Sequence, residues 1–197
     1  MKLYFKSWLW GCLLIFIGVQ SMDASEQPLK QDWVNIHDQI KGIEAAFPRH
    51  PIHMQFDISL KEKKHTGKLE VYSVALNKAT LMLTTITSPD LTETILEPSQ
   101  FKNIFYSVII QRMFYYPRKF QDHQVFKQEK IVYQGQPALS FSFSYHDKGM
   151  PQSLSGLAIL QNQRLYILFY LAAKQDFQQE TAQKFLHSFQ FLKNEND

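Results

Sequence analysis

Residues 52–60 read IHMQFDISL and carry the clearest β-strand signal in the chain. Apolar and polar side chains alternate through this stretch without a break, which is the period of a strand with one apolar face. Pro48 and Pro51 come just before it, and proline cannot donate a backbone hydrogen bond to a neighbouring strand. We therefore expect a strand that begins directly after Pro51.

Strand patterns continue on both sides of this stretch. Before it, apolar residues alternate through 42–47. After it, a polar turn at 61–67 leads to a strand around 69–74, and Asn77-Lys78 closes a hairpin onto 81–87. Further strands are expected at 125–133, 138–145, 154–160 and 164–172, with a short last one at 190–193. Successive short strands of this kind predict hairpins and an antiparallel sheet.

Two segments change to the helical period. Apolar residues share one face of 101–115, with Ser99 as the expected N-cap, and Pro117 disfavours any continuation. A second helix is expected to begin at Asp176, with Gln179 in the reciprocal capping position. The chain is therefore predicted to have an α+β fold, with a central antiparallel sheet of about six to seven strands and two main helices packed on its faces.

The N-terminal 21 residues have the pattern of a cleavable secretory signal peptide. Lys2 and Lys6 precede an apolar run over 8–19, which is shorter than the roughly 20 residues that a membrane-spanning helix needs. Cleavage is expected after Ser21, with the bond after Ala24 as the alternative. We therefore expect an exported protein, periplasmic or extracellular, with no permanent membrane span.

Cys12 raises the alternative of a lipid anchor, because LWGC at 9–12 has some likeness to a lipid-attachment box. The bulky Trp10 and the long apolar run after the cysteine argue against that anchor. Cys12 is also the only cysteine in the chain. After cleavage, therefore, neither a disulfide nor a multi-cysteine metal site can form.

Removal of residues 1–21 leaves an almost neutral chain. The whole sequence has 21 basic and 18 acidic residues, and the removed segment contains two lysines and no acid, so 19 and 18 remain, a net charge of +1. Such a balance does not favour nucleic acid or an anionic membrane as a partner. The remainder is expected to comprise a flexible lead-in at 22–32, a single domain at 33–193 and a tail at 194–197.

Several segments together resemble the PsbP/Mog1-like fold family, including its small secreted bacterial members. The similar stretches are GIEAAFPRHP at 42–51, TITSP at 85–89 with the Thr84 before it, GQPA at 135–138, RLYIL at 164–168 and FLHSFQF at 185–191. The resemblance covers most of 33–192, and it implies a central antiparallel sheet with helices on its faces. Relatives of this type are mostly binding or assembly proteins, such as extrinsic photosystem subunits, a Ran-binding import factor and bacterial envelope proteins. None of these stretches is a catalytic signature.

The sequence contains no pattern typical of a catalytic or cofactor site. It has no Gly-x-Ser-x-Gly elbow, no Walker loop and no Gly-x-Gly-x-x-Gly. Only His50 and His53 lie close together, and two ligands do not make a zinc site. We therefore expect no cofactor, no metal and no enzyme activity. The alternative is a hydrolase whose dispersed histidines converge on folding: His37, His123, His146 and His187.

Two segments are candidates for contact with a partner. The first is an aromatic run whose side chains are common anchors of protein interfaces, with packing against the sheet as the alternative. It consists of Phe114, Tyr115, Tyr116, Arg118, Lys119 and Phe120. The second is a basic cluster that suits an acidic partner or phosphates, or that forms a solvated turn protecting the strand ends. It consists of Lys61, Lys63, Lys64 and Lys68.

The sequence thus favours an exported, non-enzymatic binding or assembly domain of the bacterial cell envelope. The signal peptide, the lack of catalytic motifs and the family resemblance all point in this direction. The expected partner is another envelope protein, which no motif identifies. The alternative function is a carrier of a small apolar ligand, held in a pocket between the helix at 101–115 and the sheet.

Overall fold

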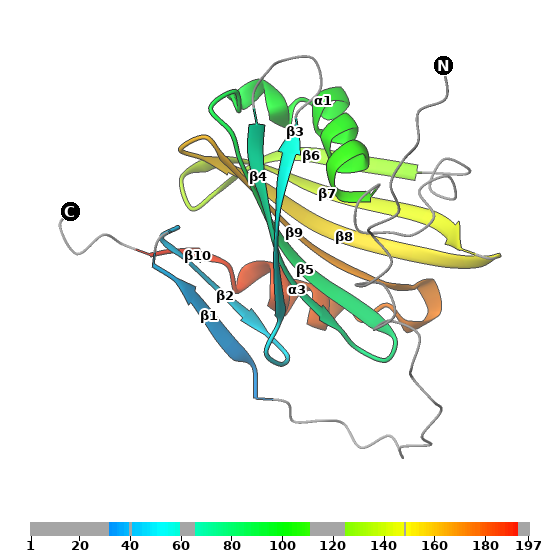
Figure 1. Ribbon diagram of the computed structural model, residues 1–197. Helices are drawn as coiled ribbons and strands as arrows, with labels where there is room; N and C mark the ends of the chain where they lie inside the picture. The colour runs from blue at the N-terminus through cyan, green and yellow to red at the C-terminus, as the bar shows by residue number, and fades with distance from the viewer. Residues whose placement is uncertain (1–31, 40, 60–65, 111–124, 148, 193–197) are drawn as a thin grey trace, which may run out of the picture. The chain divides into compact units, whose positions relative to one another are not determined.

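Seven antiparallel strands form the main sheet, in the spatial order β3-β4-β5-β9-β8-β7-β6 (Figure 1). The computed structural model describes residues 32–39, 41–59, 66–110, 125–147 and 149–192. The strands of this sheet are β3 (Ile52–Ser59), β4 (Thr66–Ala75), β5 (Ala79–Thr87), β6 (Val125–Tyr133), β7 (Gln136–Asp147), β8 (Met150–Gln161) and β9 (Arg164–Ala173). Together with two helices they confirm the predicted α+β class and the predicted number of strands.

Tight hairpins join most of these strands. Gln134 and Gly135 have positive φ angles between β6 and β7, and Asn162 and Gln163 have them between β8 and β9. Two-residue turns of this geometry match the twist of the flanking strands. Between β5 and β6 the chain crosses to the far edge of the sheet and then returns strand by strand, so that β9 pairs with β5.

A second, three-stranded sheet was not predicted. It has the order β1-β2-β10 and consists of β1 (Val34–Asp38), β2 (Ile43–Phe47) and β10 (Gln190–Phe191). Strands β2 and β10 were expected, but β2 pairs with β1 on one side and with β10 on the other instead of joining the main sheet. Strand β1 has a weak sequence signal, because it is only five residues long and its inward side chains are just half-buried.

The first helical segment differs from its prediction at the N-terminus. A 3₁₀ turn, η2 (Glu93–Leu96), leads into α1 (Pro98–Ile104), whose N-cap is Glu97. Pro98 occupies the first turn, where its missing N–H costs no hydrogen bond, so Ser99 lies inside the helix and is not its cap. The helix continues as a π-helix, η3 (Phe105–Ile110), and its predicted end near 115 lies outside the described residues.

The second helix, α3 (Gln179–His187), has its N-cap two residues later than predicted. Its N-cap is Gln178, which makes no side-chain capping bond. Asp176 instead ends a short 3₁₀ turn, η5 (Lys174–Asp176), so the predicted capping box with Gln179 does not form. Within the part of the chain that the structure describes, no helix is long and apolar enough to cross a membrane.

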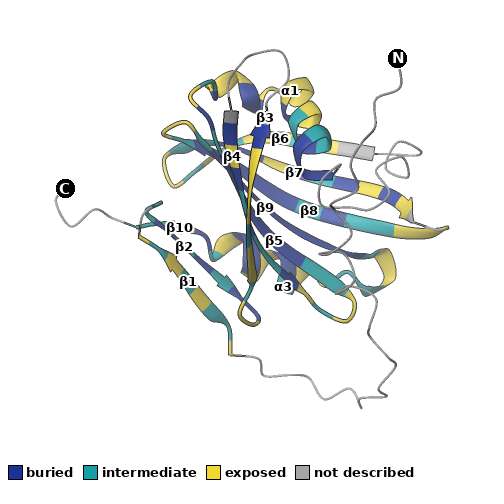
Figure 2. Cartoon of the chain, in the orientation of Figure 1, coloured by how far each residue is buried: buried dark blue, intermediate teal, exposed yellow. Residues whose placement is uncertain are grey.

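The two faces of the main sheet carry separate cores (Figure 2). On one face, Phe101 and Phe105 of the first helical segment pack against Phe141 at ring-centroid distances of 4.9 and 5.2 Å. On the other face, α3 and the small sheet cover the strands, and Phe185 lies 5.0 Å from Phe47. Burial on both faces explains why β9 is almost uniformly apolar.

The most clearly patterned strand, β3, lies at the edge of the main sheet and is only partly buried. Ile58 is 2% exposed, but Ile52 is 59% and Phe56 38% exposed. The alternating pattern therefore predicted the strand correctly, whereas the apolar face that it implies is covered only at one end.

Candidate functional site

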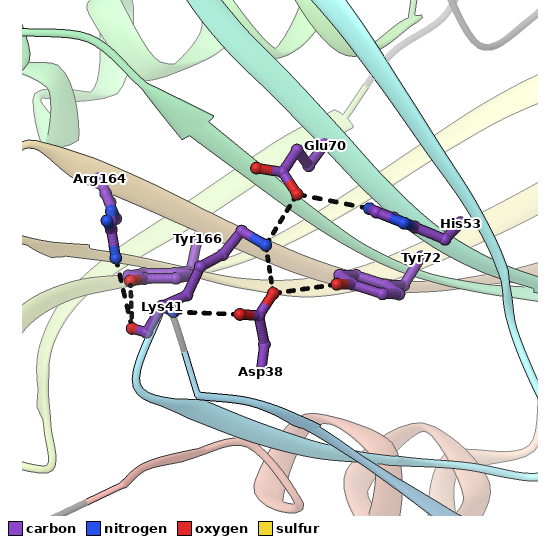
Figure 3. A network of polar contacts seen from close by, with 7 residues as sticks. All are labelled: Asp38, Lys41, His53, Glu70, Tyr72, Arg164 and Tyr166. Atoms are coloured by element: carbon purple, nitrogen blue, oxygen red, sulfur yellow. Dashed lines mark hydrogen bonds and ion pairs between the residues drawn. The ribbon is translucent and has the colours of Figure 1, made fainter.

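Lys41 forms the centre of a polar cluster where the β1–β2 turn meets the main sheet (Figure 3). Its ammonium group contacts the carboxylates of Asp38 and Glu70, the latter at 2.7 Å. The three side chains are only 10–15% exposed. Asp38 ends β1 and Glu70 lies in β4, so this lysine ties the small sheet to the main one.

Neighbouring aromatic side chains complete the cluster. The Tyr72 hydroxyl donates to Asp38 Oδ2 at 3.0 Å, and the Tyr72 ring stacks on His53 at a centroid distance of 4.4 Å. His53 Nε2 lies 3.3 Å from Glu70 Oε2. His53 and Tyr72 are cross-strand partners in β3 and β4, so the register of this hairpin brings the two rings together.

The charges of the cluster are internally compensated. Burial opposes ionisation of Asp38, but hydrogen bonds from the Lys41 side chain and backbone outweigh it and hold the pKa of this carboxyl below its ordinary value. Burial also opposes the Lys41 charge, yet Asp38 and Glu70 raise the pKa of the ammonium. Burial raises the pKa of the Tyr72 hydroxyl.

These shifts define what the cluster can do chemically. A lysine whose pKa is raised stays protonated, so it is neither a nucleophile nor a general base near neutral pH. A carboxylate with a lowered pKa is likewise a poor proton donor. The Lys41 cluster therefore links the two sheets as a structural clasp, and His53, at 46%, is its most exposed side chain.

Two further side chains hold the backbone of the turn. Arg164 donates to the Lys41 carbonyl at 3.4 Å, and the Tyr166 hydroxyl reaches the same oxygen at 3.5 Å. Both come from β9, the strand at the centre of the main sheet. The position of Lys41 is thus fixed through its main chain as well as through its ion pairs.

A separate open hollow of about 470 Å³ lies beside the β6–β7 hairpin. Its walls come from η2 and from the end of that hairpin, and they combine exposed apolar and charged side chains. Val132 is 76% exposed there, although it is a large aliphatic residue. The lining residues are Glu93, Thr94, Leu96, Glu97, Lys130, Ile131, Val132, Gly135, Pro137 and Ala138.

The hollow carries an excess of negative charge. Lys130 Nζ pairs with Glu97 Oε1 at 2.6 Å. Glu93 contributes a second carboxylate, and no described residue forms an ion pair with it. The lining thus has one cation, Lys130, and two carboxylates, Glu97 and Glu93. The hollow therefore suits a group that carries both a positive charge and an apolar surface.

The predicted contact residues fall mostly outside the described part of the chain. This holds for the whole aromatic run, Phe114, Tyr115, Tyr116, Arg118, Lys119 and Phe120, and for Lys61, Lys63 and Lys64 of the basic cluster. Lys68 is described: it lies in β4, is exposed and faces Asp57 across the strand pair. Both surfaces therefore remain predictions.

The histidines of the hydrolase alternative lie on different elements. His37 is in β1, where it pairs with Glu44 at 3.5 Å, His146 is near the end of β7, and His187 is the last residue of α3. His123 lies outside the described residues. His50 and His53 are both exposed, and the described residues contain no group of three potential metal ligands.

The interface of the first helical segment with the sheet, where the ligand-carrier alternative placed its pocket, is filled by aromatic rings over the described residues. Phe105 alone meets Phe141, Phe169 and Phe101 at centroid distances of 5.2–5.8 Å. The hollow described above lies beyond this interface, toward the edge strand β6.

Sequence reasoning missed both sites for the same reason. The Lys41 cluster draws its residues from β1, β3, β4 and β9, and the hollow draws its residues from η2 and the β6–β7 hairpin. Only the fold brings these segments together. No local pattern marks Val132, since a single exposed aliphatic residue is common on protein surfaces.

Comparisons with known proteins leave the family of this chain open. No protein-family model matches it, and no curated protein matches it. Among solved structures, one similar chain is a protein of unknown function from Pseudomonas aeruginosa, with 11% sequence identity and a TM-score of 0.35. The match covers 73% of this chain and 85% of that one. A likeness this distant carries no argument about function.

Proposed function

We propose that this chain is an exported, non-enzymatic binding or assembly domain of the bacterial cell envelope. The observation that supports this best is the hollow beside the β6–β7 hairpin, whose lining includes the exposed Val132 and Glu93, a carboxylate that no described residue pairs with. Mixed apolar and charged surface of this kind suits protein recognition. The segment that fits is one in which Lys or Arg stands next to an apolar side chain.

Two features of the sequence support the export part of the proposal. The first 21 residues have a charged start, a short apolar middle and a small-residue exit. The resemblance to the PsbP/Mog1-like family adds relatives that are mostly binding or assembly proteins, among them bacterial envelope proteins. The observed α+β sheet is of the kind that this resemblance implies, although a shared fold does not by itself define a function.

The chemistry of the polar cluster supports a non-enzymatic role. Lys41 is the only lysine that the structure shows between two carboxylates among the described residues, and its raised pKa keeps it charged. Catalytic sites instead shift pKa values toward the working pH. The cluster thus stabilises the fold and leaves recognition to the surface.

Affinity capture from envelope extracts tests the proposed site. The wild-type protein should retain a partner, and Val132→Glu and Glu93→Lys should each reduce its recovery at least tenfold. Met150→Glu is the matched control, because Met150 is also an exposed apolar residue, at 54%, but lies at the start of β8. Equal recovery by all four proteins would contradict the site, and a turnover that requires this chain would contradict the non-enzymatic role.

A carrier of a small ligand remains the second candidate. The volume of the hollow, about 470 Å³, lies within the range of small-molecule sites. Its open form and its charged lining favour a protein segment instead. Saturable binding of an apolar dye that Val132→Glu abolishes, without any captured protein, would favour the carrier.

A further inference from the structure

Strand β3 has an open edge in the described part of the chain. It is the terminal strand of the main sheet and pairs there with β4 alone. The backbone N–H and C=O groups on its other side are therefore available to another strand. Figure 1 shows β3 at the border of the sheet, beside β4.

The side chains of β3 make this edge unusual. Ile52 and Phe56 are 59% and 38% exposed, and Met54 between them is partly buried. These three residues alternate with polar ones, so they share one face of the sheet. An exposed edge strand with an apolar face is a ready template for pairing with a strand of another chain.

The opposite edge strand is built differently. In β6, Lys127, Glu129 and Lys130 are exposed. Charged residues, lysine above all, protect the edges of natural sheets against pairing. Of the two edges of the main sheet, β3 is thus the one suited to accept a strand.

We propose that β3 pairs with β3 of a second copy of this chain, antiparallel and centred on Gln55. In this register Ile52 lies opposite Ile58, and Met54 lies opposite Phe56, so apolar residues meet on one face. On the other face His53 lies opposite Asp57, and the two-fold symmetry creates this contact twice.

The register is set by complementarity on both faces. Asp57 and His53 are exposed, and His53 keeps a ring edge accessible beside Glu70. A register shift by one residue would place apolar side chains opposite polar ones. A shift by two residues, which moves the centre to Met54 or Phe56, would remove the His53–Asp57 contacts. A self-complementary strand of this kind matches the isologous interface of a symmetric dimer.

A cysteine at the symmetry centre tests this register. In a Cys12→Ser background, Gln55→Cys should form an intermolecular disulfide under mild oxidation, because opposed Cα atoms in antiparallel strands lie about 4.5–5.5 Å apart. Asp57→Cys is the matched control: it is an exposed position on the same face, but its copy would lie about 13 Å away along the strands. Equal cross-linking of both variants, or of neither, would overturn the register.

Light scattering of the purified protein tests the dimer without cross-linking. The wild type should have twice the mass of the chain, and Phe56→Glu should have the mass of one chain with an unchanged circular dichroism spectrum. Val132→Glu places the same charge on the opposite edge and should remain dimeric. If Phe56→Glu fails to fold, Ile52→Glu serves instead, because Ile52 is more exposed.

The proposal would be overturned if the wild-type protein had the mass of a single chain at all concentrations up to the hundreds of micromolar. It would be overturned in the same way if β3 bound an extended segment of another protein while the chain stayed monomeric. This outcome is independent of the proposed function. Val132→Glu is expected to lose the envelope partner but to keep the dimer, whereas Phe56→Glu is expected to lose the dimer. The two proposals therefore fail separately.

Discussion

At the scale of single residues, Lys41 makes the strongest prediction. Lys41→Met would leave the carboxylates of Asp38 and Glu70 close together without a cation, at a place where all three side chains are only 10–15% exposed. Loss of one member of such an ion pair costs more than loss of a surface pair. We expect the free energy of unfolding, measured with urea, to fall by about 2 kcal/mol.

Lys78→Met is the matched control for this change. Lys78 also pairs with an aspartate, Asp176 at 3.2 Å, but it is 61% exposed. Solvent screens this pair, so its removal should lower stability by less than about 1 kcal/mol. Equal effects of the two substitutions would show that the Lys41 cluster is not a clasp.

The lowered pKa of Asp38 predicts a pH dependence. This carboxyl stabilises the fold while it is ionised, so its contribution is present above its ordinary pKa of 3.8 and is lost as the pH falls through the lower value in the folded state. The stability difference between wild type and Asp38→Asn should therefore be level near neutral pH and shrink below about pH 4. Urea unfolding from pH 7 down to pH 2 measures it, and a constant difference would contradict the prediction.

Gly156 is required by close packing in β8. A Cβ atom at this position would lie 2.3 Å from the Phe141 ring and 2.8 Å from the Leu168 carbonyl oxygen. The ring and the backbone must move to admit a methyl group, so Gly156→Ala should destabilise the protein by about 1–3 kcal/mol. Ser155→Ala, one residue earlier on the other face of the strand, should change the unfolding free energy by less than about 0.5 kcal/mol. A neutral Gly156→Ala would contradict this packing.

At the scale of elements, local sequence patterns predicted which segments form strands and helices. The alternation in 52–60 identified β3, and the strand patterns at 125–133 and 138–145 identified β6 and β7. Helix starts were less accurate, because Pro98 entered the first turn and moved the cap to Glu97. At α3, Asp176 lies in a 3₁₀ turn that precedes the helix, so it is not the N-cap.

The location of each element in the fold could not be predicted from its pattern. A central strand and an edge strand can show the same alternation as β3. The alternation tells which residues face each side of the sheet, and it does not tell which strands lie next to this one. The short β2 and β10 have strand patterns that do not tell one sheet from another. Assembly of Lys41, Glu70 and Tyr72 depends on that tertiary placement, and so does the hollow at Val132.

At the scale of the whole molecule, the described surface divides into three regions with different roles. The Lys41 cluster joins the two sheets through the ion pairs of Lys41 with Asp38 and Glu70. The β3 edge fits a second copy, and the hollow at the β6–β7 hairpin fits a partner segment that carries a cation. In this account the molecule binds other proteins and performs no reaction. It binds its partner beside the edge strand β6 and a second copy of itself at the opposite edge strand, β3.

Site-specific photo-cross-linking in living bacteria tests this account most directly. A photoreactive amino acid at Val132 should give a discrete adduct with another envelope protein, and the adduct should be lost when Glu93→Lys is added. The same amino acid at Met150 should give none. An adduct pattern that is the same at both positions, or a Val132 adduct that forms only with cytoplasmic proteins, would contradict the proposal that this chain is an exported binding domain.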